Sequence, residues 1–252
     1  VTMYGIYNLI MVVDKNGNLV SVNDVAPDGS KIDTSKLYQL NYAKFPWFQS
    51  VMNDNFTIDK ENGFNGTYVE DPHFDEFTRL AYNKSMYGNS FSTAIKDAQG
   101  NIIGVMTNRA DIKWIGTEFK LLYKTLHKKG VQDVELTLLD EKGTVIFEYD
   151  PFANNMNQDL ISNPDVLGKF NLVDRKVESA IQVVKGQTGY DISMNARKKI
   201  RQISGYTPII SPKWPKSLKW SILKRAKADG AFPEITNLKN QYFLIMAIIL
   251  PL

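Results

Sequence analysis

Three stretches of the chain run from an apolar segment through an acidic turn into a second apolar segment. The turns lie at residues 14–17, 97–100 and 140–143, and each consists of Asp, two linking residues and Gly. The aspartate carboxylate accepts hydrogen bonds from the turn backbone, and glycine adopts the positive φ angle that other residues resist. Because β-branched and aromatic residues flank each turn, the pattern predicts three β-hairpins.

The first and third hairpins are separated by half of the chain. Asp14 and Asp140 lie 126 residues apart in a sequence of 252 residues, which is the pattern of two similar modules in tandem. The apolar segments predict about five strands in each module. The predicted strands are 6–13, 19–22, 67–70, 89–96 and 102–107 in the first module, and 134–139, 144–149, 186–194, 201–210 and 218–226 in the second.

Helical periodicity appears between these strands. Pro46 suits the first turn of a short helix in which Trp47 and Val51 are spaced for one face. Residues 110–129 carry an apolar stripe near period 3.6 and predict a connector helix, and residues 172–185 predict a further helix. The expected fold class is α+β, with two tandem modules that each contain an antiparallel sheet of about five strands and flanking helices.

The C-terminal end is unusually apolar. Residues 242–252 are eleven positions without a charged side chain. A membrane-spanning helix needs about 20 such residues, so we expect an exit helix that runs into a truncated transmembrane segment, with a buried terminal element as the alternative. The expected division is 1–112 for the first module, 113–130 for the connector helix, 131–230 for the second module and 231–252 for the exit helix.

Composition excludes several classes of function. The net charge of +3 comes from 30 basic and 27 acidic residues without a strong basic stripe, so we expect no nucleic-acid partner. The absence of cysteine excludes disulfides, thiolate metal sites and cysteine nucleophiles. The two histidines, His73 and His127, have no metal-ligand spacing, and no phosphate loop, dinucleotide fingerprint or nucleophile motif is present. We therefore expect no cofactor, no metal and no enzymatic activity.

The order of several segments is similar to that of a known family. The segments are 7–23, 46–48, 91–108, 136–151, 186–190 and 205–209, followed by the stretch 219–232 that leads into the apolar end. Together they resemble the double Cache sensor domain of bacterial chemoreceptors and sensor histidine kinases, in which two PAS-like modules stand outside the membrane. The resemblance covers nearly the whole chain.

This resemblance implies a function. The first module would be membrane-distal and bind a small organic ligand, and the second would be membrane-proximal and transmit the change to flanking membrane spans of a homodimeric receptor. The chain would then be the periplasmic or extracellular ligand-sensing region of an inner-membrane chemoreceptor. Alternatives are the sensor of a histidine kinase or cyclic-dinucleotide enzyme, a soluble enzyme with a mixed α/β fold, and a structural interaction domain.

The resemblance also bears on the ligand. Family members that bind amino acids share an Arg-x-Trp-Tyr pattern, and this chain has Phe45 where the carboxylate-holding arginine would stand. This departure argues against an α-amino acid as the ligand. The expected ligand classes are an amine, an amino-acid-like molecule or a carboxylate metabolite. The family's later aspartate has Asn108, Arg109 or Asp111 as its counterpart.

Nine residues are candidates for the ligand site. Aromatic side chains wall a pocket, lysine holds an anionic group, an acidic group suits an amine, and hydroxyl and amide groups donate and accept hydrogen bonds. Core packing, a solvated lysine and a turn-capping aspartate are the competing interpretations of the same residues. The candidates are Tyr42, Lys44, Trp47, Phe48, Tyr68, Asp71, Ser90, Ser92 and Asn108.

Overall fold

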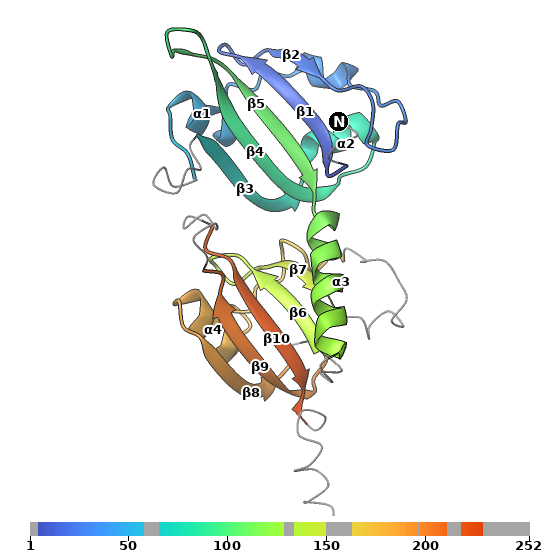
Figure 1. Ribbon diagram of the computed structural model, residues 1–252, viewed down its shortest axis with the longest axis vertical. Coiled ribbons are helices and arrows are strands. Elements are labelled where there is room, and N and C mark those ends of the chain that lie inside the picture. The colour runs from blue at the N-terminus through green and yellow to red at the C-terminus, as the bar shows by residue number, and fades with distance from the viewer. Residues whose placement is uncertain are drawn as a thin grey trace, which may run out of the picture. The chain divides into compact units, whose positions relative to one another are not determined.

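A computed structural model describes residues 5–57, 66–128, 134–149, 163–195, 197–210 and 218–228. The chain divides into two compact units, and each contains one five-stranded antiparallel sheet (Figure 1). Unit 1 comprises residues 1–118, 162–169 and 209–219, and unit 2 comprises the remainder. The predicted fold class, two tandem modules with an antiparallel sheet of five strands each, is confirmed.

The sheet of unit 1 has the strand order β2-β1-β5-β4-β3. Three short helices lie on one side of it (Figure 1), and we call that side the helix face of unit 1. The strands are β1 (Tyr7–Asp14), β2 (Leu19–Val22), β3 (Thr67–Phe74), β4 (Tyr87–Lys96) and β5 (Ile102–Asp111), and the helices are η2 (Ser35–Gln39), α1 (Pro46–Met52) and α2 (Glu76–Tyr82).

The predicted hairpin turns are present. In the first, the Asp14 carboxylate accepts hydrogen bonds from the backbone N–H groups of Asn16 at 2.9 Å and Asn18 at 2.8 Å. Gly17 has a φ of +83°, and a Cβ atom at this position would lie 2.5 Å from the backbone nitrogen of Ala43. Glycine is therefore required at this turn both by its backbone conformation and by the close approach of residue 43.

The core of unit 1 lies between the helix face and α1. Leu9, Met11 and Val13 of β1 and Val105 of β5 are fully buried there. Because successive side chains of a strand point to opposite faces, Arg109 also projects from β5 into the helix face. A charged residue thus follows the inward positions of β5 into the core.

Two helices differ from their predicted extent. The connector helix is α3 (Lys113–Lys128), because β5 continues to Asp111 and pairs with β1 and β4 along its whole length. The helix predicted over 172–185 is restricted to α4 (Glu178–Val184). Lys176 has a φ of +56°, which a right-handed helix does not accommodate.

Helix α2 was not predicted from the sequence. Asp75 caps it, since one carboxylate oxygen accepts a hydrogen bond from the backbone N–H of Thr78 at 2.7 Å. The helix ends at Asn83, which adopts the left-handed conformation. With only seven residues between the two caps, α2 is too short for a recognisable helical period.

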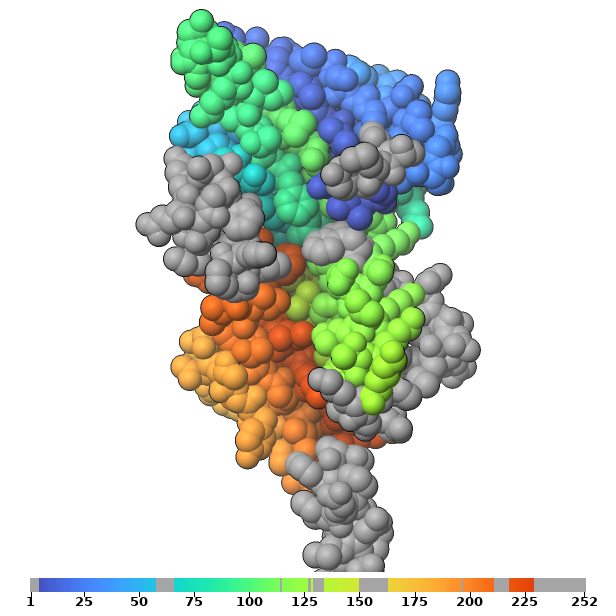
Figure 2. Space-filling model, in the orientation of Figure 1, coloured from blue at the N-terminus to red at the C-terminus, as the bar shows by residue number. Residues whose placement is uncertain are grey.

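The sheet of unit 2 has the strand order β7-β6-β10-β9-β8. Helix α3 packs on one face, where Phe119 meets Phe147 with ring centroids 4.7 Å apart, and α4 packs against β8, β9 and β10. The surface of β8 and β9 is exposed in the lower part of Figure 2. Tyr190 of β8 is 75% exposed. The strands are β6 (Val134–Leu139), β7 (Val145–Tyr149), β8 (Gly189–Met194), β9 (Arg201–Pro208) and β10 (Ser221–Lys227).

The expected exit helix at 231–252 lies outside the described residues. Among the helices that are described, none is both long and apolar enough to cross a membrane.

Candidate ligand-binding site

Four aromatic side chains form a continuous layer over the helix face of unit 1, and we call Tyr42, Phe45, Trp47 and Phe77 the aromatic layer. The ring centroids of Phe45 and Phe77 are 5.1 Å apart, those of Tyr42 and Phe77 are 5.3 Å apart, and Phe45 stacks on Trp47 at 6.4 Å. Tyr42 donates its hydroxyl proton to the Leu37 carbonyl at 2.9 Å. Burial raises the pKa of Tyr42, so its phenol stays neutral.

A charged cluster is buried beneath this layer. Arg109 is only 2% exposed, and its Nη1 donates to Glu70 Oε2 at 2.9 Å while its Nε lies 3.4 Å from Asp75 Oδ2. The guanidinium carbon is 5.3 Å from the centroid of the Trp47 ring and 4.8 Å from that of Phe77. The arginine is therefore held by two carboxylates and two aromatic faces. We call Glu70, Asp75, Ser90 and Arg109 the buried ion cluster.

Neighbouring groups tune the acidity of this cluster. Burial raises the pKa of the Asp75 carboxyl, but the hydrogen bond with His73, the Arg109 charge and the Thr78 N–H outweigh it, so the pKa lies below its usual value. Burial lowers the pKa of His73, but the Asp75 side chain and the Asp71 carbonyl outweigh that effect and raise it. The cluster thus has two carboxyl groups for one guanidinium, and His73 supplies a second cation only when it is protonated.

Six of the nine predicted site residues share this face of the sheet. Ser90 donates its hydroxyl proton to Glu70, and Ser92 forms a hydrogen bond of 2.7 Å with the Thr107 hydroxyl. Tyr68 lies beside Ser92 on the neighbouring strand and packs against the core. The gathered residues are Tyr42, Trp47, Phe48, Tyr68, Ser90 and Ser92.

An open hollow of about 480 Å³ adjoins the aromatic layer on its outer side. Lys44 and Glu76 line it, so it offers one cation and one carboxylate. Phe45 belongs both to this hollow and to the aromatic layer, and Phe77 behind it contacts Arg109. The aromatic layer therefore separates the hollow, whose volume suits a small molecule, from the buried ion cluster.

The other three predicted residues do not join the cluster. Lys44 is exposed at the hollow. Asp71 is exposed at a register shift of β3, where its carbonyl accepts a hydrogen bond of 2.8 Å from His73 when Nδ1 carries the proton. Asn108 is adjacent to Arg109 in β5 and so faces the opposite side of the sheet, where its Oδ1 has no hydrogen-bond partner among the described residues. Their roles in binding stay predictions.

The sequence named Arg109 only as one of three counterparts of a family residue, and it did not single out Asp75. The available signal was the charged residue at an inward position of β5. Strand alternation from Val105 through Thr107 leads to Arg109, and a buried charge implies a partner. The partner could not be read in the same way, because Glu70 is 39 residues away.

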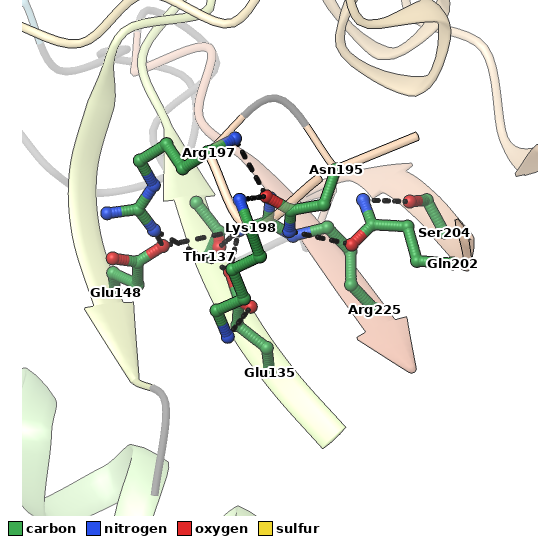
Figure 3. A network of polar contacts seen from close by, with 9 residues as sticks. All are labelled: Glu135, Thr137, Glu148, Asn195, Arg197, Lys198, Gln202, Ser204 and Arg225. Carbon is green, nitrogen blue, oxygen red and sulfur yellow. Dashed lines mark hydrogen bonds and ion pairs between the residues drawn. The ribbon is translucent and has the colours of Figure 1, made fainter. Parts of the chain in front are cut away.

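Unit 2 contains a second buried polar network (Figure 3). Arg225 Nη2 donates to Glu135, to the Thr137 hydroxyl and, at 3.3 Å, to Glu148 Oε1. Lys198 Nζ donates to Glu135 Oε2 at 2.7 Å, and Arg197 pairs with Glu148. Asn195, Gln202 and Ser204 extend the network by hydrogen bonds.

The two carboxylates of this network have opposite acidities. Burial raises the pKa of Glu135, but the charges of Arg225 and Lys198 outweigh it, so the pKa is lowered. Burial and the neighbouring Glu135 charge raise the pKa of Glu148, despite its contacts with Arg197 and Arg225. Within the residues that the structure describes, no three His, Asp or Glu side chains are grouped to hold a metal ion.

Comparison with known proteins identifies the fold. No protein-family model matches the chain, and no curated protein matches it in sequence. The ligand-binding domain of the amino acid chemoreceptor PctB from Pseudomonas aeruginosa, in complex with L-Arg, superposes with a TM-score of 0.53 at 12% identity, over 94% of this chain and 72% of that one.

Two further solved structures have the same fold. The periplasmic sensory domain of the Campylobacter jejuni chemoreceptor Tlp1 gives a TM-score of 0.53 at 13% identity, over 90% of this chain and 74% of that chain. The extracellular domain of rpHK1S-Z16, described as a histidine kinase, gives 0.52 at 12% identity, over 88% and 71%. The fold is therefore that of receptor sensor domains, as the resemblance in the sequence predicted.

Proposed function

We propose that this chain is the extracytoplasmic ligand-sensing domain of a transmembrane chemoreceptor, and that unit 1 binds a small organic metabolite. The observation that carries the proposal is the buried ion cluster beneath the aromatic layer. A buried ion pair contributes little net stability compared with an apolar core, so its presence favours a role in recognition. Perturbed pKa values beside a hollow are typical of functional sites.

The proposed ligand is an amine, an amino-acid-like molecule or a carboxylate metabolite. Aromatic faces, two carboxylates and a guanidinium are available to it. The complex of PctB with L-Arg is a precedent for an amino acid in this fold. The proposal does not include catalysis, because the sequence has no nucleophile motif and the structures with this fold are sensor and receptor domains.

The signal would leave unit 1 through β5. This strand carries Arg109 and continues within four residues into α3, whose first N–H, that of Lys113, donates to the Asp111 carboxylate at 2.9 Å. A ligand that moves Arg109 would therefore shift the start of α3 through the covalent chain. The shift is limited by the difference in ligand affinity between the two arrangements.

The proposal extends to the surroundings of this region. We infer that it stands in the periplasm or outside the cell, is attached to the inner membrane by flanking spans, and works as a homodimer. The proposed division remains 1–112 for the ligand-binding module, 113–130 for the connector helix, 131–230 for the membrane-proximal module and 231–252 for the exit helix.

Thermal unfolding of the chain against a library of small metabolites tests the proposal. A ligand that binds only the folded state adds about 2.7 kcal/mol of stability at a concentration about 100 times its Kd. Trp47→Phe is expected to weaken that binding, because it removes the indole ring above Arg109. Trp220→Phe in unit 2 is the matched control and should leave binding unchanged. A library without any stabilising metabolite, or a ligand insensitive to Trp47→Phe, contradicts the proposed site.

The sensor domain of a histidine kinase is the second candidate. It is favoured by the similarity to the extracellular domain of rpHK1S-Z16. Both candidates use the same ectodomain, and the output domain encoded beyond this region distinguishes them. A methyl-accepting signalling helix indicates a chemoreceptor, and a kinase core indicates the second candidate.

A further inference from the structure

Arg109 and Arg225 occupy equivalent positions in the two sheets. Arg109 of β5 is paired with Leu9 of β1, and Arg225 of β10 is paired with Glu135 of β6. Leu9 and Glu135 are themselves 126 residues apart, the same interval that separates the hairpin aspartates. On its other side each arginine is paired with a serine, Ser90 in unit 1 and Ser204 in unit 2. Each unit therefore has an arginine at the equivalent position of a sheet with the same strand order.

The neighbours of these two arginines differ in one systematic respect. Arg225 donates to oxygens of Glu135, Thr137 and Glu148, as Figure 3 shows. The strand register assigns apolar counterparts to all three acceptors. The counterparts in unit 1 are Leu9 for Glu135, Met11 for Thr137 and Val22 for Glu148.

Unit 1 consequently has a donor without an acceptor. Arg109 Nη2 is buried and has no hydrogen-bond partner among the residues that are described, whereas Arg225 Nη2 has three. The Nε atoms of both arginines are buried without a hydrogen bond in the same set, and that of Arg109 lies 3.4 Å from Asp75 Oδ2. Trp47 Nε1, on the ring that contacts the guanidinium, is a second buried donor with no partner in the same set. A buried donor that stays unpaired is unfavourable, because it has lost its hydrogen bonds to water. Two of them in adjacent, almost fully buried side chains indicate a site that an acceptor completes.

Charge restricts what that acceptor can be. In unit 2 three cationic side chains, Arg197, Lys198 and Arg225, surround two glutamates, so carboxylates are well compensated. In unit 1 Arg109 already faces Glu70 and Asp75, and an added anion would leave the cluster with two uncompensated negative charges unless His73 is protonated. A buried charge without compensation is strongly unfavourable. The acceptor therefore belongs to a molecule without net negative charge.

We propose that the ligand of unit 1 carries no net negative charge and provides an acceptor oxygen to Arg109 Nη2 and Trp47 Nε1, such as an amide carbonyl or the carboxylate of a zwitterion. This inference rests on the proposed function and names the ligand chemistry of the same site. The oxygen takes the place that the Glu135 and Thr137 oxygens take in unit 2. Of the ligand classes proposed above, this inference removes the simple carboxylate anion.

The route to these donors passes through the aromatic layer. Phe45 lines the open hollow and stacks on Trp47, and its other neighbour Phe77 covers Arg109. Phe45 is partly exposed, unlike Trp47, so entry from the hollow requires the Phe45 side chain to turn aside. A ligand that enters from the hollow then lies between aromatic faces with its oxygen directed at Arg109.

An NMR experiment on the indole N–H of Trp47 tests the inference without a disruptive variant. The 252-residue chain is labelled with ¹⁵N-tryptophan, and the Trp47 signal is assigned as the one that is lost in Trp47→Phe. The probes are propionamide and β-alanine against propionate at equal concentration. Propionamide or β-alanine is expected to shift the Trp47 signal saturably, and propionate is expected to leave it in place. The inference is overturned when neither of the first two moves the signal, or when propionate moves it equally.

Leu9→Gln provides the matched variant. It places a neutral amide oxygen at the position of Glu135, where it should accept from Arg109 and weaken the binding of propionamide at least about tenfold. Leu9→Met is the control for altered packing and should bind propionamide like the wild type. If folded Leu9→Gln, checked by circular dichroism, binds propionamide unchanged, the inference fails. A metabolite that stabilises the chain while both probe experiments fail leaves the proposed function standing without this ligand chemistry.

Discussion

Arg109 and Glu70 form an ion pair of 2.9 Å that spans three strands, because Ser90 of β4 lies between them in the sheet and donates to the same Glu70 oxygen. The pair holds the edge strand β3 to the central strand β5 by side chains as well as by backbone. The guanidinium side chain is 3% exposed and that of Glu70 is 22% exposed, so water screens the pair weakly.

Breaking this pair from one side should destabilise unit 1 strongly. Arg109→Met leaves the buried Asp75 and the partly exposed Glu70 without their cation, and we expect a loss of about 3–5 kcal/mol in the free energy of unfolding measured with urea. Arg79→Met is the control, since Arg79 pairs with Glu76 at 3.6 Å on an exposed surface and should cost less than about 1 kcal/mol. Equal losses of unfolding free energy in the two variants would show that the buried ion pair stabilises the fold no more than the exposed one.

The stability of unit 1 should decrease as the pH rises above neutrality. The pKa of His73 is raised in the folded state, so its contribution is complete below the ordinary value of 6.5 and is lost as the pH rises through the folded pKa. Thermal unfolding between pH 6 and about pH 8 measures the loss, and His73→Gln should remove it. If the stability of His73→Gln decreases with pH as steeply as that of the wild type, another group causes the effect.

Acid should destabilise the same region through Asp75. Its pKa is lowered in the folded state, so its contribution is complete above the ordinary value of 3.8 and is lost as the pH falls through the folded pKa. Asp75→Asn is expected to flatten the acid limb of the stability curve, and it also weakens the cap of α2. Asp97→Asn is the control, because the pKa of this hairpin carboxyl is also lowered but the group lies at the surface. This variant should flatten the acid limb less than Asp75→Asn does.

The glycines of two hairpin turns should differ in their tolerance of alanine. Gly17 and Gly100 both have positive φ, +83° and +87°, but a Cβ at Gly17 would clash with Ala43 whereas one at Gly100 meets no atom within 4 Å in the described part of the chain. Gly100→Ala should cost about 1 kcal/mol from backbone conformation alone. Gly17→Ala should cost clearly more, measured by urea unfolding. Equal costs would mean that Ala43 moves aside freely.

The two glutamates of unit 2 should respond differently to neutralisation. The raised pKa of Glu148 means that folding disfavours its ionised form, so Glu148→Gln should cost less unfolding free energy than the same change at Glu135. Glu135 is held ionised by Arg225 and Lys198, and Glu135→Gln should cost about 2–4 kcal/mol because it leaves buried cations under-compensated. Urea unfolding at pH 7 compares these isosteric variants, and the reverse order would contradict the assigned acidities.

The strands and hairpins were predictable because their signals are local. Asp14, Gly17 and their equivalents specify turns through neighbouring backbone groups. Boundaries that depend on distant partners were less accurate. β5 extends to Asp111 because β1 and β4 supply hydrogen bonds along it, and α4 is shortened because Lys176 takes a positive φ.

The candidate site was predictable only in part. Trp47, Ser90 and Ser92 were identified from aromatic character and strand alternation, and they do share one face. Asn108 was chosen over its neighbour, although alternation from the apolar position Val105 assigns the inward direction to Arg109. The partner of that arginine depends on which strands are adjacent.

The sequence by itself determined the turns, the 126-residue repeat and the faces of each strand, since these follow from interactions between residues close together in the chain. Only the tertiary structure decided that β5 lies between β1 and β4. Pairing between distant strands brings Arg109 to Glu70 and, in the second sheet, Arg225 to Glu135. Those contacts depend on the packing of the whole sheet, which no local pattern records.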